Sequence, residues 1–279
     1  MRTIDEGALR EAAERRFRSE YDYAVFEYLR SGKVVEAIER AGTRLFGRVL
    51  DAGCGGGGTA VSLAEEAAFA VGLDLDARFL GSGTRLVAEK GVRNAAFVQG
   101  DGERLPFRGG AFDVVLSHSV IEHVTSATAY LRECHRVLRP GGVLYLSTAP
   151  YLSLAGAHLP RLLVPLPLHI LIGRRAAFRA FRLLARRAPW LLQEPKEANT
   201  FIALAEQGKD KHDDLLQRVT VRRLSAWIRD AGFRLVREDH HVTGFFRRAL
   251  PPPARRLLEK APLARDVMIG HIQCVLVKP

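Results

Sequence analysis

Cysteine is scarce in this sequence. The three residues, Cys54, Cys134 and Cys274, are scattered over 279 positions. They form neither a disulfide framework nor a metal-ligand spacing, so we expect no metal site and a reducing, cytoplasmic compartment. Residues 1–30 are charged throughout, which predicts no signal peptide. Residues 159–172 are apolar but interrupted by prolines and an arginine, and they are too few for a membrane-spanning helix, which needs about 20.

Acidic residues are also in deficit. Lysine and arginine number 42 against 31 acids, a formal net charge of +11. This excess predicts affinity for an anionic partner: nucleic acid, a phospholipid surface or an acidic substrate. The length and the 47% hydrophobic content are sufficient for one large α/β domain, alone or with a lid.

A glycine cluster follows the first short apolar run. Residues 51–57 read D-x-G-x-G-x-G, and residues 59–64 read as the first turns of a helix. Glycines are needed where the backbone turns sharply and a ligand approaches more closely than a Cβ permits. The helix start behind them presents unpaired N–H groups. This pattern indicates a ligand site, and the alternative is a glycine-rich connection without a ligand.

Asp51 discriminates between the cofactors that such a loop can hold. Gly53, Gly55 and Gly58 fit G-x-G-x-x-G, and Asp74 follows about 20 residues on, as in a nicotinamide-dinucleotide site. However, the Asp51 carboxylate would repel a pyrophosphate. A cofactor with a cationic centre or a free amine and no phosphate suits the loop better, and S-adenosyl-L-methionine fits that description. Here the chain resembles the class I S-adenosylmethionine-dependent methyltransferases.

Four later segments strengthen the resemblance. A strand ends at Asp74, G-D-x-x-x-L-P-F begins at Gly100, F-D-V-V and E-H-V fall within 111–124, and L-R-P-G-G occupies 138–142. In this order they resemble the type 11 methyltransferases, which include quinone-ring and sugar O-methylating enzymes. The resemblance implies a Rossmann-like, doubly wound α/β fold with a seven-stranded sheet. Its last strand is antiparallel, between strands five and six, and a helical insertion follows the fifth strand.

The resemblance also assigns cofactor-binding residues. Asp74 matches the acid that bonds both ribose hydroxyls, and Asp101 matches the one that bonds the adenine amino group; an Asx-turn is the alternative for Asp101. Methyl transfer leaves S-adenosyl-L-homocysteine as the product. The other predicted cofactor residues are Asp51, Gly53, Cys54, Gly55, Gly57, Leu75, Gly102, Glu103, Ser117 and His118.

The implied reaction is an in-line displacement at the sulfonium methyl group, and an oxygen acceptor must lose its proton. His123 is the first candidate for the base and His118 the second, because both lie at the carboxyl end of the fourth strand. No N/D-P-P-Y/F and no Pro-Cys pair follows this strand, which disfavours amino-group methylation and a covalent cysteine mechanism. Alternative bases are His158, His212, His240 and His241.

Residues 5–30 are predicted to be helical, with apolar positions recurring at helical spacing. Helices before the first strand often cap the cofactor cleft in the resembled family. Tyr21 or Tyr23 therefore either contacts the ligand or packs in the core.

We expect three parts: helices and the cofactor core over 1–150, a helical insertion or lid over 151–215, and the rest of the sheet over 216–279. Residues 173–187 read as a basic amphipathic helix with six arginines and no acid. Such a helix is an interfacial anchor, a partner-binding helix, a cap over the substrate, or an ordinary surface helix packed on the core. Peripheral membrane contact through 159–187 is therefore one expectation.

The leading interpretation is an O-methyltransferase for a small hydrophobic or anionic acceptor, such as a lipid, quinone, sugar or natural product. An RNA methyltransferase is the enzymatic alternative, and a non-catalytic scaffold is the third. Nucleic acid is less favoured because, in the basic helix, only Phe178 and Phe181 interleave with the arginines. The sequence leaves the acceptor and the oligomeric state open.

Overall fold

The computed structural model describes residues 5–16, 18–42, 47–153, 156–159, 168–191 and 216–279. The chain forms two compact units. Their residue ranges divide within β5, β6 and β7, so each of these strands contributes residues to both units. Unit 1 comprises Met1–Leu146, Trp227–Glu238 and Cys274–Pro279, and unit 2 comprises Ser147–Ala226 and Asp239–Gln273.

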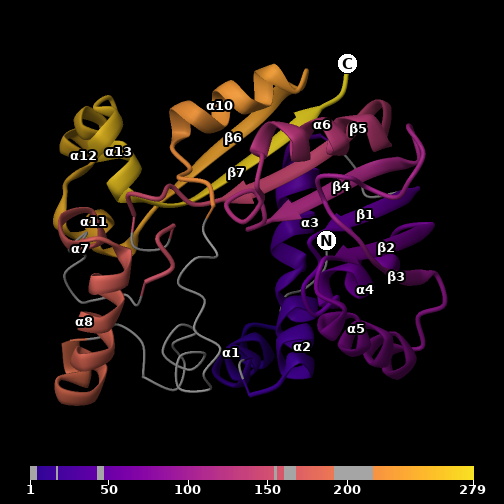
Figure 1. Ribbon diagram of the computed structural model, residues 1–279, viewed down its shortest axis with the longest axis horizontal. Coiled ribbons are helices and arrows are strands. Elements are labelled where there is room, and N and C mark those ends of the chain that lie inside the picture. The colour runs from indigo at the N-terminus through magenta and orange to yellow at the C-terminus, as the bar shows by residue number, and fades with distance from the viewer. Residues whose placement is uncertain (1–4, 17, 43–46, 154–155, 160–167, 192–215) are drawn as a thin grey trace. The chain divides into compact units, whose positions relative to one another are not determined.

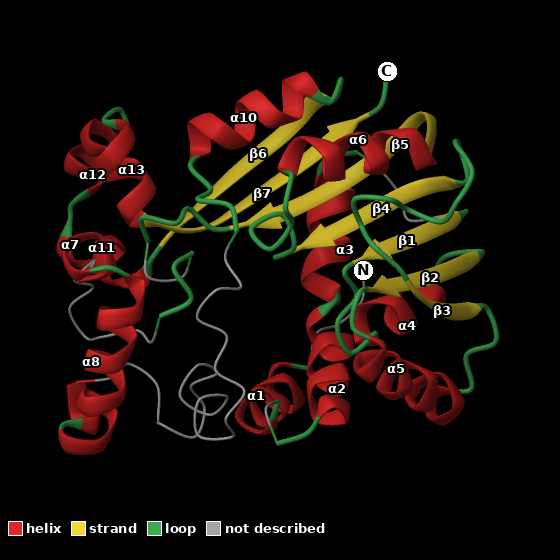
Figure 2. Cartoon of the chain, viewed as in Figure 1, coloured by secondary structure: helices red, strands yellow, loops and turns green. Residues whose placement is uncertain are grey.

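Helices and strands alternate along most of the chain (Figures 1 and 2). The strands are β1 Arg48–Ala52, β2 Phe69–Asp74, β3 Ala95–Gln99, β4 Phe112–His118, β5 Leu138–Thr148, β6 Arg234–Val242 and β7 Ile269–Val277. The helices up to β5 are α1 Glu6–Arg15, α2 Glu20–Arg30, α3 Gly32–Arg40, α4 Gly58–Ala64, α5 Ala77–Lys90 and α6 Ala127–Val137. The later ones are α7 Leu168–Ile172, α8 Arg174–Arg187, the 3-10 turn η1 Pro189–Leu191, α10 Val221–Asp230, α11 Gly244–Ala249, α12 Pro252–Leu258 and α13 Pro262–Met268.

The seven strands form one sheet in the order β3-β2-β1-β4-β5-β7-β6. β1 pairs in parallel with β2 and β4, and β2 pairs in parallel with β3. Lys278, just after β7, exchanges backbone hydrogen bonds with Gly141 and Gly142 near the start of β5, at 2.9 and 3.0 Å, as antiparallel strands do. The predicted fold is confirmed, including the last strand between strands five and six.

The sheet of unit 1 has helices on both faces, with α3 behind it and α6 in front in Figure 1. Alternate residues of the strands, among them Val114 and Leu116 of β4, pack with Val35 and Ile38 of α3 in one buried cluster. Val115, between them, is fully buried on the opposite face. A sheet buried on both faces explains why its strands read as continuous apolar runs.

The helical prediction over residues 5–30 is confirmed, and the chain forms two helices there, α1 and α2. The connection between α1 and α2 ends at Ser19, whose hydroxyl accepts the Asp22 amide at 3.0 Å and thereby caps α2. Helix α5 begins in the same way, because the Asp76 side chain accepts the Arg78 amide at 3.1 Å and caps it. A cap of this kind can be recognised in a sequence only where the charged residues around it do not continue the helical pattern.

The basic amphipathic helix of unit 2 is α8, as predicted. Phe178 and Phe181 are buried in a cluster with Ala157 and Leu159, so the apolar face of α8 is covered within its own unit. Residues 192–215, the last part of the predicted insertion, lie outside the described residues. In the part of the chain that the structure describes, no helix is both long enough and apolar enough to cross a membrane.

Candidate cofactor site

The glycine loop connects β1 to α4 at the carboxyl edge of the sheet. The amides of Gly53 and Cys54 both donate to the Leu73 carbonyl, at 2.7 and 2.9 Å, which ties the loop to β2. Gly57 caps α4 with φ +81°, a conformation that favours glycine. A Cβ on Gly58 would collide with the Ala24 carbonyl of α2. This last glycine is therefore required by the packing of α2 on the loop.

Asp74 holds the loop from the end of β2. Its Oδ2 accepts the Gly55 amide at 2.8 Å and its Oδ1 accepts the Asp76 amide at 2.9 Å. Each carboxylate oxygen keeps a second lone pair, so both remain able to accept from ribose hydroxyls. Leu75, the next residue, is 70% exposed at the same edge.

Asp51 and Glu27 place two further carboxylates at the loop. Asp51 is the second-last residue of β1 and is 4% exposed, whereas Glu27 comes from α2 and is 7% exposed. Burial, reinforced by Asp74, raises the pKa of Asp51 to about 7, against the opposing effect of Arg30. Burial also raises the pKa of Glu27 to about 8, with Asp51 and Asp74 adding to it and Arg30 opposing it. Glu27 Oε2 is buried and has no hydrogen-bond partner among the described residues.

Two neighbouring groups are held in their neutral forms. The Glu27 charge, followed by burial, raises the pKa of Tyr23 well above its ordinary value, so its phenol stays protonated. Burial, followed by Asp51 and Asp74, raises the pKa of Cys54, which excludes a thiolate nucleophile there. A Cβ on Gly55 would lie 3.2 Å from Glu27 Oε1 and 3.3 Å from the Tyr23 ring, so both side chains border the loop.

The predicted adenine segment after β3 forms a hydrogen-bonded turn. Asp101 Oδ1 accepts the Glu103 amide at 2.8 Å, which is the Asx-turn that the sequence offered as the alternative role. The Glu103 carboxylate accepts the amides of Thr125 and Ser126 at 2.6 and 2.9 Å, and it thereby links this turn to the start of α6. A Cβ on Gly102 would lie 2.8 Å from the Tyr130 ring. Asp101 itself is exposed.

The end of β4 carries the residues predicted for catalysis. Ser117 is fully buried, and its Oγ lies 2.9 Å from the Tyr130 hydroxyl. His118 follows and is half-buried. The next residue, Ser119, has φ +56°, a strained conformation for a residue with a side chain. Strain of this kind is concentrated at functional sites.

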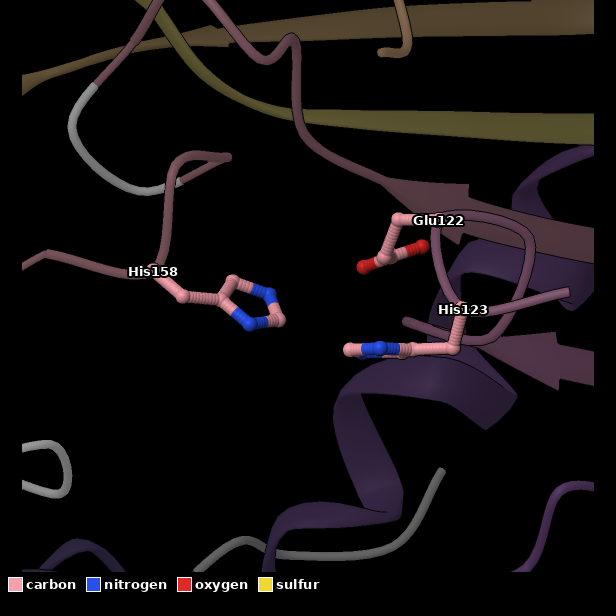
Figure 3. A group of neighbouring side chains, drawn as sticks. All are labelled: Glu122, His123 and His158. Atoms are coloured by element: carbon pink, nitrogen blue, oxygen red, sulfur yellow. The ribbon is translucent and has the colours of Figure 1, made fainter. Parts of the chain in front are cut away.

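Glu122 and His123 lie on the loop between β4 and α6, and their side chains extend to the same side of it (Figure 3). The His123 amide donates to the Val120 carbonyl at 2.8 Å, which fixes the turn. Glu122 is buried and His123 is half-buried. His158, also labelled in Figure 3, belongs to unit 2.

The remaining histidine candidates also belong to unit 2. His240 and His241 are exposed and line a pocket of about 430 Å³, where His241 Nε2 lies 3.1 Å from Gln273 Oε1. His212 lies outside the described residues. His118 and His123 are thus the histidines at the carboxyl edge of β4 within unit 1.

Glu27 is the residue that the sequence analysis missed. It lies one helical turn after Tyr23 and next to the buried side of α2, where Ala24 is fully buried. A carboxylate on the buried side of an otherwise amphipathic helix is the only available signal. It is weak, because the sequence does not indicate that α2 packs on the glycine loop.

The residues at the loop fit the predicted cofactor. Three carboxylates, from Glu27, Asp51 and Asp74, lie at the loop. The arginine whose charge opposes the pKa rise of both Glu27 and Asp51 is Arg30. Buried carboxylates with raised pKa values and an unsatisfied oxygen are stabilised by a cation that brings hydrogen-bond donors. An ammonium group meets this need, a sulfonium adds positive charge without a donor, and a pyrophosphate is repelled. Glu27 and Asp51 would hold the amino-acid end, and Asp74 the ribose.

Comparison with known proteins agrees with this geometry. A family model described as "Methyltransferase domain" matches residues 50–146, which contain the loop, Asp74 and β4. Over 203 residues the chain is 30% identical to a ubiquinone biosynthesis O-methyltransferase of Pseudomonas aeruginosa (strain LESB58), covering 69% of this chain and 82% of that protein. The chain belongs to the class I S-adenosylmethionine-dependent methyltransferases of the type 11 group. The predicted cofactor of this methyltransferase, S-adenosylmethionine, is therefore confirmed.

Two further similarities define how far the match extends. The methyltransferase is 41% identical over 112 residues to a ubiquinone biosynthesis O-methyltransferase of Sodalis glossinidius, covering 40% of this chain but only 45% of that protein's length. It also resembles an S-adenosylmethionine-dependent methyltransferase structure from Mesorhizobium loti, with a TM-score of 0.50, 18% identity, and coverage of 87% of this chain and 96% of that one. The first match covers less than half of either chain, and the second shows the fold.

Proposed function

We propose that this methyltransferase transfers a methyl group to an oxygen of a small hydrophobic or anionic acceptor, such as a lipid, quinone, sugar or natural product. The observation that carries the proposal is the acid-lined glycine loop, with the unsatisfied Glu27 Oε2 beside Asp51. The relatives named ubiquinone biosynthesis O-methyltransferase support an oxygen acceptor.

S-adenosylmethionine supplies an electrophilic methyl group on a sulfonium centre. The chain's own contribution is placement and removal of the acceptor proton. Asp51, Glu27 and Asp74 orient the donor at the carboxyl edge of β1 and β2. His123, on the loop after β4, is the proposed base, and His118 is the second candidate.

The proposal is tested by incubating the full chain with methyl-labelled S-adenosylmethionine and a cell extract separated into lipid, polar-metabolite and RNA fractions. Label is expected in the lipid or apolar fraction, and Asp74→Ala should abolish it. Asp230→Ala, at an exposed carboxylate of α10, is the matched control and should keep full activity. Label in RNA would establish the RNA methyltransferase instead. Cofactor binding without label in any fraction would favour the scaffold.

The base is tested separately with His123→Gln. The rate of the chemical step should fall about a hundredfold while cofactor affinity is unchanged, because general-base catalysis contributes roughly 10²–10⁴-fold. His135→Gln, at a ring that packs on Phe233 in unit 1, is the control. An unchanged rate in His123→Gln with a lowered rate in His118→Gln would transfer the role to His118.

We also propose peripheral contact with an anionic phospholipid surface through the region 159–187. The buried apolar face of α8 takes no part, so the contact is assigned to exposed side chains of α7 and of the α8 margin, such as Leu171 at 77% and Leu183 at 53% exposure. The arginines of α8 support attraction to anionic lipid. In vesicle sedimentation, Leu171→Ser should lower binding, whereas Leu263→Ser, at an equally exposed leucine of α13, should not.

A further inference from the structure

Unit 2 contains a second, chemically distinct pocket of about 1160 Å³. It is lined by α7, by the first turns of α8, by the segment after β5 around Tyr151, and by residues 216–223. Figure 1 shows α7 leading into α8. All of the residues that line it belong to unit 2, so its shape depends on that unit alone.

The pocket is strongly basic. Among the described residues that line it there is no Asp or Glu, whereas five are arginines. Three of the five come from α8, and the other two are Arg218 and Arg223. Two contacts orient this second pair: the Arg218 guanidinium lies 5.4 Å from the Tyr151 ring centroid, and Arg223 donates to the Arg218 carbonyl at 2.9 Å. Like charges gathered in one pocket repel, and an anion relieves that repulsion.

The start of α8 adds backbone donors to the same pocket. Gly173, the N-cap, provides no side-chain hydrogen bond, and the residues 173–176 all line the pocket. The first amides of a helix have no partner within the helix and carry a partial positive charge. They therefore favour an anionic group at this position.

His169 supplies an independent indication of a ligand. The residue lines the pocket and is only 3% exposed. Its Nε2 donates to the Tyr151 carbonyl at 2.8 Å, which leaves Nδ1 as the acceptor of the neutral ring. Nδ1 is buried, and no described residue bonds to it. A ligand with a hydroxyl donor would satisfy it.

Part of the remaining lining is apolar. Leu152, Ile170, Ile172 and Leu216 contribute to the pocket. Ile170 and Ile172 are 47% and 52% exposed, and Leu216 is 54% exposed. An apolar wall beside a cluster of arginines matches a ligand that has an anionic head and an apolar tail.

We propose that this pocket binds an amphiphile with a phosphate monoester head and an apolar tail. A guanidinium group can bond two phosphate oxygens at once, which is the role assigned to Arg179 and Arg218, and the amides at the start of α8 add donors. The monoanionic form of the monoester carries one P–OH group, and its proton satisfies His169 Nδ1 either as a hydrogen bond or after transfer to the ring. The tail covers the exposed leucine and isoleucine side chains. This assignment is independent of the acceptor and of methyl transfer.

The test is calorimetric titration of the full chain with dodecyl phosphate below its micelle concentration, at an ionic strength of about 0.15 M. Inorganic phosphate and dodecyltrimethylammonium are titrated in parallel. Dodecyl phosphate should bind at least about tenfold more tightly than either, and the double variant Arg179→Gln and Arg218→Gln should lose about tenfold or more in affinity. The matched control is Arg186→Gln with Arg187→Gln, at exposed arginines of the last α8 turn that do not line the pocket.

Three results would overturn the assignment. Equal affinity for inorganic phosphate would make the site one for free phosphate, and equal affinity for the cationic amphiphile would make it merely apolar. An equal loss in both double variants would reduce it to a general charge effect. Because Arg179 and Arg218 are exposed, both variants are expected to fold, and unchanged S-adenosylhomocysteine binding confirms this for each protein.

Discussion

Glu27 lies in an environment that conflicts with its charge. Its carboxyl is buried, near Asp51 and Asp74, and one oxygen is unsatisfied among the described residues. In a protein without ligand this arrangement is unfavourable, because an ionised group is desolvated beside like charges. A cation that arrives with the cofactor accounts for such a residue. The Glu27 carboxylate therefore destabilises the ligand-free protein but favours cofactor binding.

Replacing Glu27 with glutamine should therefore separate stability from binding. We expect Glu27→Gln to raise the melting temperature of the ligand-free protein and to weaken S-adenosylhomocysteine binding about tenfold, which is about 1.4 kcal/mol. Calorimetric titration and thermal unfolding measure the two effects. Glu39→Gln, at an exposed position of α3, should change neither. A loss of stability in Glu27→Gln without loss of affinity would mean that Glu27 has only a structural role.

The raised pKa values of Asp51 and Glu27 also predict a pH dependence. The pKa rises from 3.8 to about 7 for Asp51 and from 4.5 to about 8 for Glu27 on folding. Below both unfolded values each group is protonated in both states and contributes no difference. As the pH rises, the unfolded chain releases protons that the folded chain retains, so the free energy of unfolding falls until the folded groups also ionise.

The ligand-free protein should thus lose several degrees of melting temperature between about pH 5 and about pH 8. The double variant Asp51→Asn and Glu27→Gln should lose less over the same range. Affinity for the cationic amino end of S-adenosylhomocysteine should change in the opposite direction and increase with pH, because ionised carboxylates bind it best. Parallel melting curves for the two proteins at every pH would exclude these groups as the source.

At the scale of elements, the packing of α2 on the glycine loop organises the site. Gly56 and Gly58 both face the backbone of α2 at Ala24, so two small residues allow a close helix-to-loop contact. That contact brings Tyr23 and Glu27 to Gly55. The sequence assigned the glycines to the approach of a ligand, whereas part of the cluster serves the approach of this helix.

Gly58→Ala should consequently destabilise the protein by about 2 kcal/mol, since the added Cβ collides with the Ala24 carbonyl and overpacking costs roughly 1–3 kcal/mol. Urea unfolding measures the difference. Gly81→Ala is the matched control, because Gly81 lies within α5 with no heavy atom near the added Cβ, and it should stabilise by about 0.5–1 kcal/mol. Equal effects at both positions would contradict the close packing of α2.

At the scale of the whole molecule, the net charge of +11 acts without regard to the fold. It gives affinity for any polyanion, so RNA binding by itself does not indicate an RNA substrate. Specific recognition of RNA uses stacking aromatic residues and base contacts, and binding of that kind depends less on salt.

We therefore expect a mixed-sequence RNA to bind weakly and to lose at least about tenfold in affinity between about 50 and 200 mM salt. Fluorescence anisotropy with a labelled RNA measures this, and an uncharged polymer of similar size is the control. Affinity that persists at the higher salt, together with label transferred to RNA, would restore the RNA methyltransferase as the leading function.

The sequence by itself indicated the cofactor class and, through a resemblance, the family and the place of its last strand, because the motifs that carry them are local. A run of apolar residues, a turn of glycines and an acid at the strand end occur within a few consecutive positions, as at Asp51 and Asp74. Where several such signals follow one another at βα spacing, the parallel sheet is the only fold that accommodates them.

Only the tertiary structure decided which distant groups meet. The carboxylate of Glu27 reaches the loop because α2 packs on Gly58, and the arginine pocket of unit 2 forms because residues 216–223 fold back beside α7 and α8. The His169 ring is buried beside Tyr151, and its Nδ1 is left without a hydrogen-bond partner among the described residues. No local sequence pattern indicates this. Contacts between residues far apart in the chain depend on how whole elements pack together. The spacing of residues along one element does not encode that packing.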